Sequence, residues 1–265
     1  MTILSFLAIA LYLGSSVMLG MRLSRGAAGV QLGKLGIVGI GLGAVLLHAT
    51  ILYQDLFTQA GLNLGVSNAS SLIAWFVATL LLLAALSRPV ENLGIVLLPA
   101  AAITIVLARL FPTEHVLTTD GTLEIHILVS MLAYSLLTMA AVQAILLSLQ
   151  DRQLHRRRPG GLIRALPPLQ IMESLLFDMI WVGFMMLSVA LVTGFIFLND
   201  MFAQHLVHKT VLSIAAWSMF GILLWGRQRY GWRARVASRW TLWGFLALLM
   251  AYMGSKFVLE VFIGA

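Results

Sequence analysis

Long apolar runs separated by short connections dominate the sequence and limit what it can fold into. Each run approaches the ~20 residues that cross a bilayer as a helix. We therefore predict eight transmembrane spans, at residues 2–20, 35–53, 70–87, 92–109, 122–149, 175–198, 207–226 and 240–262. A soluble fold is excluded because 60% of the residues are hydrophobic and 10% are charged, whereas soluble domains average about 45–50% and about 25%.

Little chain remains between the runs for a second domain. The expected architecture is a single all-α domain over residues 1–265, a polytopic membrane bundle of about eight transmembrane helices. The first run begins MTILSFLAIALYLG, with no basic segment before it and no clear cleavage site. We accordingly expect a retained helix rather than a cleaved signal peptide.

The basic residues lie on one side of the predicted spans. Fourteen of the seventeen lysines and arginines fall in alternate connections, namely 21–34, 88–91, 150–174 and 227–239. The intervening connections carry acidic residues and neither lysine nor arginine: 54–69, 110–121 and 199–206. Basic loops face the cytoplasm, so both termini are predicted to be external. The net charge of +7 then reflects topology, and the expected contacts are the lipid bilayer and its anionic headgroups rather than nucleic acid.

The composition excludes several kinds of site. The sequence has no cysteine, which rules out a thiol relay, an iron–sulfur cluster and a covalently attached c-type haem in this chain. It also lacks an HExxH motif and the histidine spacing typical of zinc sites. We do not expect an enzyme, because the residues offer metal ligands and not an acid/base pair.

Five of the six histidines are predicted to lie on the outer side. His155 lies in a cytoplasmic connection among arginines, as a solvated residue. His48 is about 21 Å of helical rise beyond Lys34, and His126 begins the fifth span. The other outer histidines are His115, His205 and His208. Imidazole inside a membrane is costly and binds haem iron well, so we predict a shared haem site with His126 and His48 as metal ligands and His205 and His208 nearby.

Each outer histidine also has a structural explanation, as an interfacial polar residue with a satisfied hydrogen bond. We favour that explanation for His115 and His205, and a functional role for His48 and His126. The pair His205 and His208 is spaced so that both side chains can face one way on a helix.

Several stretches resemble the cytochrome c assembly family of membrane proteins (CcmC, CcsA and HemX-like), in its YpjD-like bacterial inner-membrane branch. The stretch 126–134, HILVSMLAY, is similar to the family's H-V-x-x-M-x-x-Y-A, whose histidine is an external haem ligand. Other matching positions are Asn68, Ser71, Leu72, Trp75, Gly183, Phe184, Leu187, Gly194, Trp217, Gly231, Trp232, Arg233, Ala237, Tyr252 and Gly254. The resemblance covers nearly the whole chain and implies a multi-pass protein of the bacterial inner (plasma) membrane.

The chain departs from this family pattern on the outer side. Members that present haem to cytochrome c have a tryptophan-rich external loop, where this chain reads NDMFAQHLVHKTVLS. A later family histidine is Trp225 here, and the last external histidine has no counterpart. The resemblance therefore carries only His126 and His48 over as haem ligands.

Haem also needs apolar walls and cations for its propionates. Trp75 and Trp217 are candidates for the walls, although ordinary packing or an interfacial aromatic belt also explains them. Lys209 and Lys256 are candidates for the propionates. Lys256 has an alternative as the helix partner of Glu260 or as a snorkelling side chain.

The expected function is the binding or handling of non-covalent haem b near the outer leaflet, with haem and other membrane or cytochrome-assembly proteins as partners. A first alternative is a scaffold or regulator that kept the fold without haem. A second is a transporter of a small solute, which the lack of a clear repeat and of paired broken helices disfavours.

Overall fold

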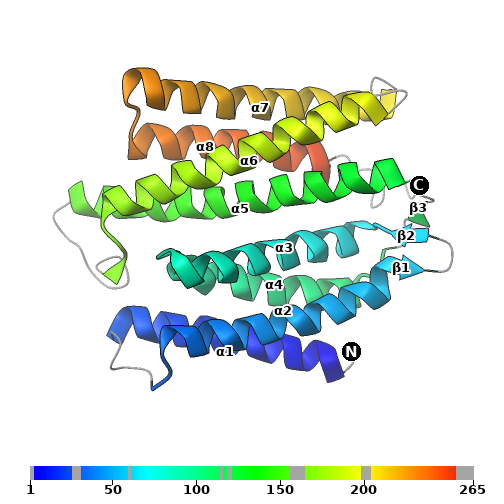
Figure 1. Ribbon diagram of the computed structural model, residues 1–265, viewed down its shortest axis with the longest axis horizontal. Coiled ribbons are helices and arrows are strands. Elements are labelled where there is room, and N and C mark those ends of the chain that lie inside the picture. The colour runs from blue at the N-terminus through cyan, green and yellow to red at the C-terminus, as the bar shows by residue number, and fades with distance from the viewer. Residues whose placement is uncertain are drawn as a thin grey trace. The chain divides into compact units, whose positions relative to one another are not determined.

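The computed structural model describes residues 3–25, 31–58, 61–113, 116–117, 121–155, 165–197 and 204–254. Figure 1 shows that these residues are mainly helical, which confirms the predicted all-α class. The long helices are α1 (Ile3–Arg25), α2 (Lys34–Leu56), α3 (Val66–Ser87), α4 (Gly94–Leu110), α5 (Gly121–His155), α6 (Leu169–Phe197), α7 (Gln204–Tyr230) and α8 (Ala234–Leu249). A short turn, η2 (Glu91–Leu93), precedes α4, and a π-helical turn, η4 (Met250–Gly254), follows α8.

The described helices agree with the predicted membrane spans. Seven of them, α1 to α7, are long and apolar enough to cross a bilayer. α8 and η4 cover the first part of the eighth predicted span, and residues 255–262 of that span lie outside the described residues. The chain is thus a multi-pass helical membrane protein.

Helix ends differ from the predicted spans at the cytoplasmic side. α5 continues to His155 and α6 already begins at Leu169, after Pro167 and Pro168. Both helices exceed the ~20 residues that hydrocarbon requires, because backbone hydrogen bonding carries a helix on into the polar region. The two prolines disfavour helical geometry immediately before α6.

The helices form two compact units. The first unit comprises residues Met1–Thr118 and Gln153–Pro168, with α1 to α4, and the second comprises Thr119–Arg152 and Leu169–Ala265, with α6 to α8 and most of α5. The single domain over residues 1–265 stays a prediction.

Helix packing in the first unit depends on small and hydroxyl-bearing residues. α1 packs against α2 and α4, and α3 packs against the same two helices. Ser15 Oγ donates to the Ile37 carbonyl at 3.1 Å, and Ser16 Oγ donates to the Ile95 carbonyl at 3.2 Å. Gly41 faces α3, where an added Cβ would lie 2.9 Å from both Leu82 methyl carbons. Close backbone approach and interhelical hydrogen bonds are the usual ways of joining helices in a membrane.

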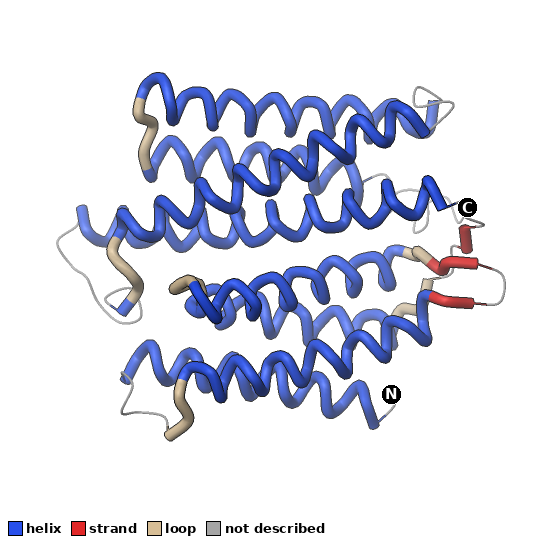
Figure 2. The backbone as a smooth tube through the Cα atoms, viewed as in Figure 1, coloured by secondary structure: helices blue, strands red, loops and turns tan. Residues whose placement is uncertain are grey.

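A small antiparallel sheet lies at the outer end of the first unit, and the sequence analysis did not predict it. Its strands are β1 (Phe57–Thr58), β2 (Gly61–Asn63) and β3 (Val116–Leu117), in the order β1-β2-β3 (Figure 2). Leu62 pairs with Phe57 on one side and with Leu117 on the other. Strands this short carry no alternating pattern, which is why periodicity could not reveal them.

Polar contacts join the helices of the second unit. Tyr134 Oη donates to the Leu248 carbonyl at 3.0 Å and so ties α5 to α8. At the cytoplasmic end, Glu173 of α6 is ion-paired with Arg227 of α7 and accepts from the Ala234 backbone N–H at 3.2 Å. One carboxylate therefore connects three helices.

Candidate functional site

His126 lies near the start of α5 in the second unit and is half-buried. Its Nδ1 is 3.1 Å from Thr193 Oγ1 of α6. The next residue, Gly194, lies directly against the ring, since an added Cβ would be 3.0 Å from His126 Cε1. α6 thus supports the imidazole with one hydroxyl and one bare Cα.

The hydroxyl of Thr193 lies close to two carbonyls of its own helix as well as to His126. Thr193 Oγ1 lies 2.9 Å from the Val189 carbonyl oxygen and 3.1 Å from that of Ala190. A hydroxyl has one proton, so Thr193 either donates it to one of these carbonyls and accepts from Nδ1–H of His126, or donates it to Nδ1. In the first arrangement the neutral ring has an unprotonated Nε2, whose lone pair a metal can bind.

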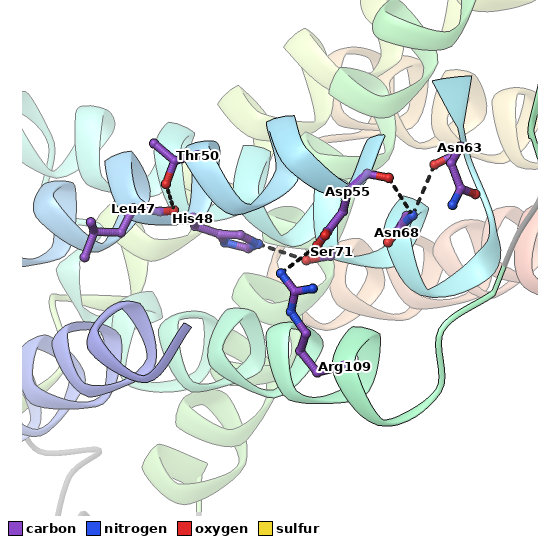
Figure 3. Close-up of polar contacts among 8 residues, drawn as sticks. All are labelled: Leu47, His48, Thr50, Asp55, Asn63, Asn68, Ser71 and Arg109. Atoms are coloured by element: carbon purple, nitrogen blue, oxygen red, sulfur yellow. Dashed lines mark hydrogen bonds and ion pairs between the residues drawn. The ribbon is translucent and has the colours of Figure 1, made fainter. Parts of the chain in front are cut away.

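His48 has a different environment in the first unit. It is fully buried, at 0% exposed, in α2. Nδ1 lies 3.2 Å from Tyr12 Oη, and Nε2 lies 2.9 Å from Ser71 Oγ, the second contact being drawn in Figure 3. Both ring nitrogens are therefore hydrogen-bonded, and an iron ligand at this position would require one of these bonds to break.

A polar cluster occupies the outer end of the first unit (Figure 3). Arg109 of α4 lies 3.0 Å from the Asp55 carboxylate of α2. Asn68 Nδ2 donates to the carbonyls of Asp55, at 3.4 Å, and of Asn63, at 3.3 Å. Arg109 was not proposed as a site residue from the sequence, although its place on the arginine-poor outer side was a usable signal. The cluster joins α2, β2, α3 and α4 next to the small sheet.

Both candidate tryptophans are hydrogen-bonded. Trp75 Nε1 donates to the Val45 carbonyl at 2.9 Å and links α3 to α2 in the first unit. Trp217 of α7, in the second unit, donates to Ser188 Oγ at 2.8 Å and stacks on Phe184 with centroids 5.4 Å apart. Trp217 remains 37% exposed. A role for either ring in a haem slot stays a prediction.

The remaining candidates are His115, His205, His208, Lys209 and Lys256. His205, His208 and Lys209 lie at the start of α7, whereas His115 and Lys256 lie outside the described residues. Among the residues described, no group of three or more His, Cys, Asp or Glu side chains could hold a metal ion. Haem iron needs only one or two protein ligands, so His126 fits haem better than it fits zinc.

Comparison with known proteins gives a consistent set of relatives. A family model described as Cytochrome C assembly protein matches residues 40–263. The chain is 32% identical over 224 residues to the inner membrane protein YpjD of Escherichia coli (strain K12), covering 82% of each protein. It is 27% identical over 138 residues to protein HemX of Brevibacillus brevis, covering 51% of each. It is also 38% identical over 144 residues to an uncharacterized 28.8 kDa protein of Azospirillum brasilense, covering 54% of the chain and 53% of that protein. No solved structure matches.

Proposed function

This chain belongs to the cytochrome c assembly protein family and is a multi-pass protein of the bacterial inner membrane, and from this we propose that it binds haem b non-covalently near the outer face of that membrane. The proposed axial ligand is His126. The observation that carries the proposal is the 3.1 Å contact between His126 Nδ1 and Thr193 Oγ1. In the proposed tautomer Nδ1–H donates to that oxygen, and the Nε2 lone pair binds the iron.

The surroundings of His126 suit a flat, apolar ligand. Gly194 lets the backbone of α6 lie directly against the imidazole and so fixes the position of the ring. Trp217 of the same unit offers a partly exposed ring, and Lys209 at the start of α7 is the proposed partner of a propionate. Bound haem would supply the iron chemistry, while these residues bind and orient it. Since they offer ligands without an acid/base pair, we propose haem holding or transfer rather than catalysis.

For a second axial ligand, we favour His205 or His208 over His48. His205 and His208 belong to the same unit as His126. His48 is engaged through both nitrogens and is fully buried. We infer that His48 stabilises the first unit in the conformation described.

A scaffold or regulatory protein that has lost haem is the second candidate function. It is favoured by the stretch 199–213, which contains no tryptophan where haem-presenting family members are tryptophan-rich. This candidate keeps the fold and the membrane location and assigns His126 to helix packing with Thr193.

The visible spectrum of the protein purified from haem-replete cells tests the proposal. We expect a Soret band that His126→Ala abolishes and that His155→Ala, at the opposite end of α5, leaves unchanged. Absence of a Soret band from folded, haem-reconstituted protein would favour the scaffold. A band that survives in folded His126→Ala would mean that another residue binds the iron.

A further inference from the structure

The connection between α7 and α8 is a compact turn at the cytoplasmic end of the second unit. Gly231 adopts φ of 64°, a conformation that favours glycine. Its N–H donates to the Arg227 carbonyl at 3.1 Å, and Arg227 Nη1 donates to the Trp232 carbonyl at 2.9 Å. The Trp232 ring covers Gly226, where an added Cβ would clash with the indole. The turn is therefore held in one shape.

Acidic side chains engage two of the five arginines around this turn. Glu173 pairs with Arg227, and Asp151 pairs with Arg235 at 3.4 Å. The other three are exposed, and in the described part of the chain they form no ion pair: Arg229, Arg233 and Arg239. The turn thus presents a positive charge that its own acidic residues do not balance.

Aromatic side chains run continuously from α7 to α8 beside these arginines. Trp225 meets Tyr230 edge-on, with centroids 5.3 Å apart. Tyr230 stacks on Trp232 at 6.4 Å, and Trp232 stacks on Trp240 at 5.7 Å. Aromatic rings of this kind prefer the boundary between hydrocarbon and headgroups.

The two helices carry the same arrangement of tryptophan and arginine in opposite chain directions. On α7, exposed Trp225 lies four residues before Arg229, and on α8, Arg239 lies four residues before exposed Trp243. Residues four apart share a helix face. Each arginine therefore lies one turn nearer the cytoplasm than a tryptophan that is 56% or 61% exposed.

We propose that this turn binds an anionic phospholipid of the cytoplasmic leaflet. The lipid phosphate pairs with Arg229 and Arg239, and Arg233 increases the positive electrostatic potential at the turn. The acyl chains lie against the exposed apolar side chains one or more turns deeper, with Trp225 and Trp243 at the level of the glycerol. The site is far along the chain from His126 and does not depend on haem binding.

The arrangement favours a lipid over free phosphate for a geometric reason. A site for inorganic phosphate needs only converging donors, whereas here each arginine has an exposed tryptophan directly below it toward the hydrocarbon. Guanidinium groups bind phosphate oxygens in a fork geometry. A zwitterionic lipid also has a phosphate, but its own cation offsets the attraction to a cluster of arginines.

Native mass spectrometry of the full-length protein in detergent tests this proposal. The probes are phosphatidylglycerol, phosphatidylcholine and inorganic phosphate, and the variant is Arg229→Gln/Arg239→Gln. We expect retained phosphatidylglycerol, little phosphatidylcholine, and at least about tenfold weaker phosphatidylglycerol binding in the double variant, since each membrane-adjacent arginine contributes about fivefold.

Arg25→Gln, at the exposed end of α1, is the matched control and should retain the lipid. Equal phosphatidylglycerol binding by wild type and the double variant would overturn the proposal, as would equal losses in the double variant and the control. Displacement of the lipid by millimolar inorganic phosphate would show a phosphate site instead. Because the substituted arginines are exposed and make no ion pair among the described residues, thermal unfolding without added lipid should be unchanged.

Discussion

His48 and His126 are the same residue type on the same predicted side of the membrane, yet the two units give them opposite environments. His48 is fully buried with both nitrogens hydrogen-bonded to side chains of α1 and α3. His126 is half-buried, with Nδ1 3.1 Å from Thr193 Oγ1 and a further hydrogen bond to the Ala190 backbone, both on α6. We infer that fully buried His48 holds helices together, and we propose that half-buried His126 binds a metal. The difference indicates that contacts with other helices decide whether a ring nitrogen is available to bind a metal.

Among the variants that test this comparison, His48→Leu is expected to have the largest effect, which is on the free energy of unfolding. Leucine fills similar space but leaves Tyr12 Oη and Ser71 Oγ without their histidine partner. We expect a loss of about 3 kcal/mol in the free energy of unfolding, since each buried group left unsatisfied costs about 1–3 kcal/mol. Thermal unfolding of the detergent-purified protein measures this loss.

Thr50→Ala is the control for His48→Leu, because Thr50 is exposed on the same helix and bonds only to the Leu47 carbonyl of its own turn, at 2.7 Å (Figure 3). The Soret band of the folded fraction should not change in His48→Leu. Loss of that band with unchanged stability would instead make His48 an iron ligand.

A smaller effect, on haem rather than on stability, is expected from Thr193→Val. Valine has the shape of threonine but cannot accept from His126 Nδ1–H. Outer-shell partners of this kind contribute about 10–100-fold to metal affinity, so haem affinity should fall by about 30-fold. The reduction potential of bound haem should rise, because the imidazole becomes a poorer electron donor. Haem titration and redox titration measure the two changes.

Two variants separate this role of Thr193 from its place in the helix. Thr193→Ser keeps the hydroxyl and should have the haem affinity and reduction potential of the wild type. Thr138→Val on α5 removes a similar hydroxyl, which bonds to the Tyr134 carbonyl at 2.7 Å, and should leave both values unchanged. Equal haem affinity and potential in wild type and Thr193→Val would contradict the proposed tautomer control.

The smallest effect in this series is expected from Gly194→Ala. The added methyl would stand 3.0 Å from His126 Cε1, so the ring must shift by a few tenths of an ångström. We expect haem affinity to fall by about fivefold, roughly 1 kcal/mol, with a changed ligand-field spectrum and no loss of folding. Gly221→Ala is the control, because its added Cβ would make ordinary contact with Phe184 at 3.5 Å. An unchanged spectrum in Gly194→Ala would mean that haem binds away from this face of the imidazole.

Membrane class and the order of the spans could be predicted from the sequence, and the sidedness of the spans stays a prediction. Hydrocarbon thickness sets the length of an apolar run, and arginine placement sets orientation. Helix ends such as His155 and Leu169 were less predictable, because a helix continues into the polar region without an apolar signal. The strands around Leu62 were missed, since their pairing depends on contacts between separate loops.

The sequence by itself determined that this is a helical membrane protein of the cytochrome c assembly family, and it predicts histidines on the outer side. Only the tertiary structure distinguished fully buried His48, bonded through both nitrogens, from half-buried His126. His126 and Thr193 are 67 residues apart, and His48 is 36 residues from Tyr12 and 23 from Ser71. Such hydrogen bonds form between helices, so local sequence patterns record the donors and acceptors but not their pairing.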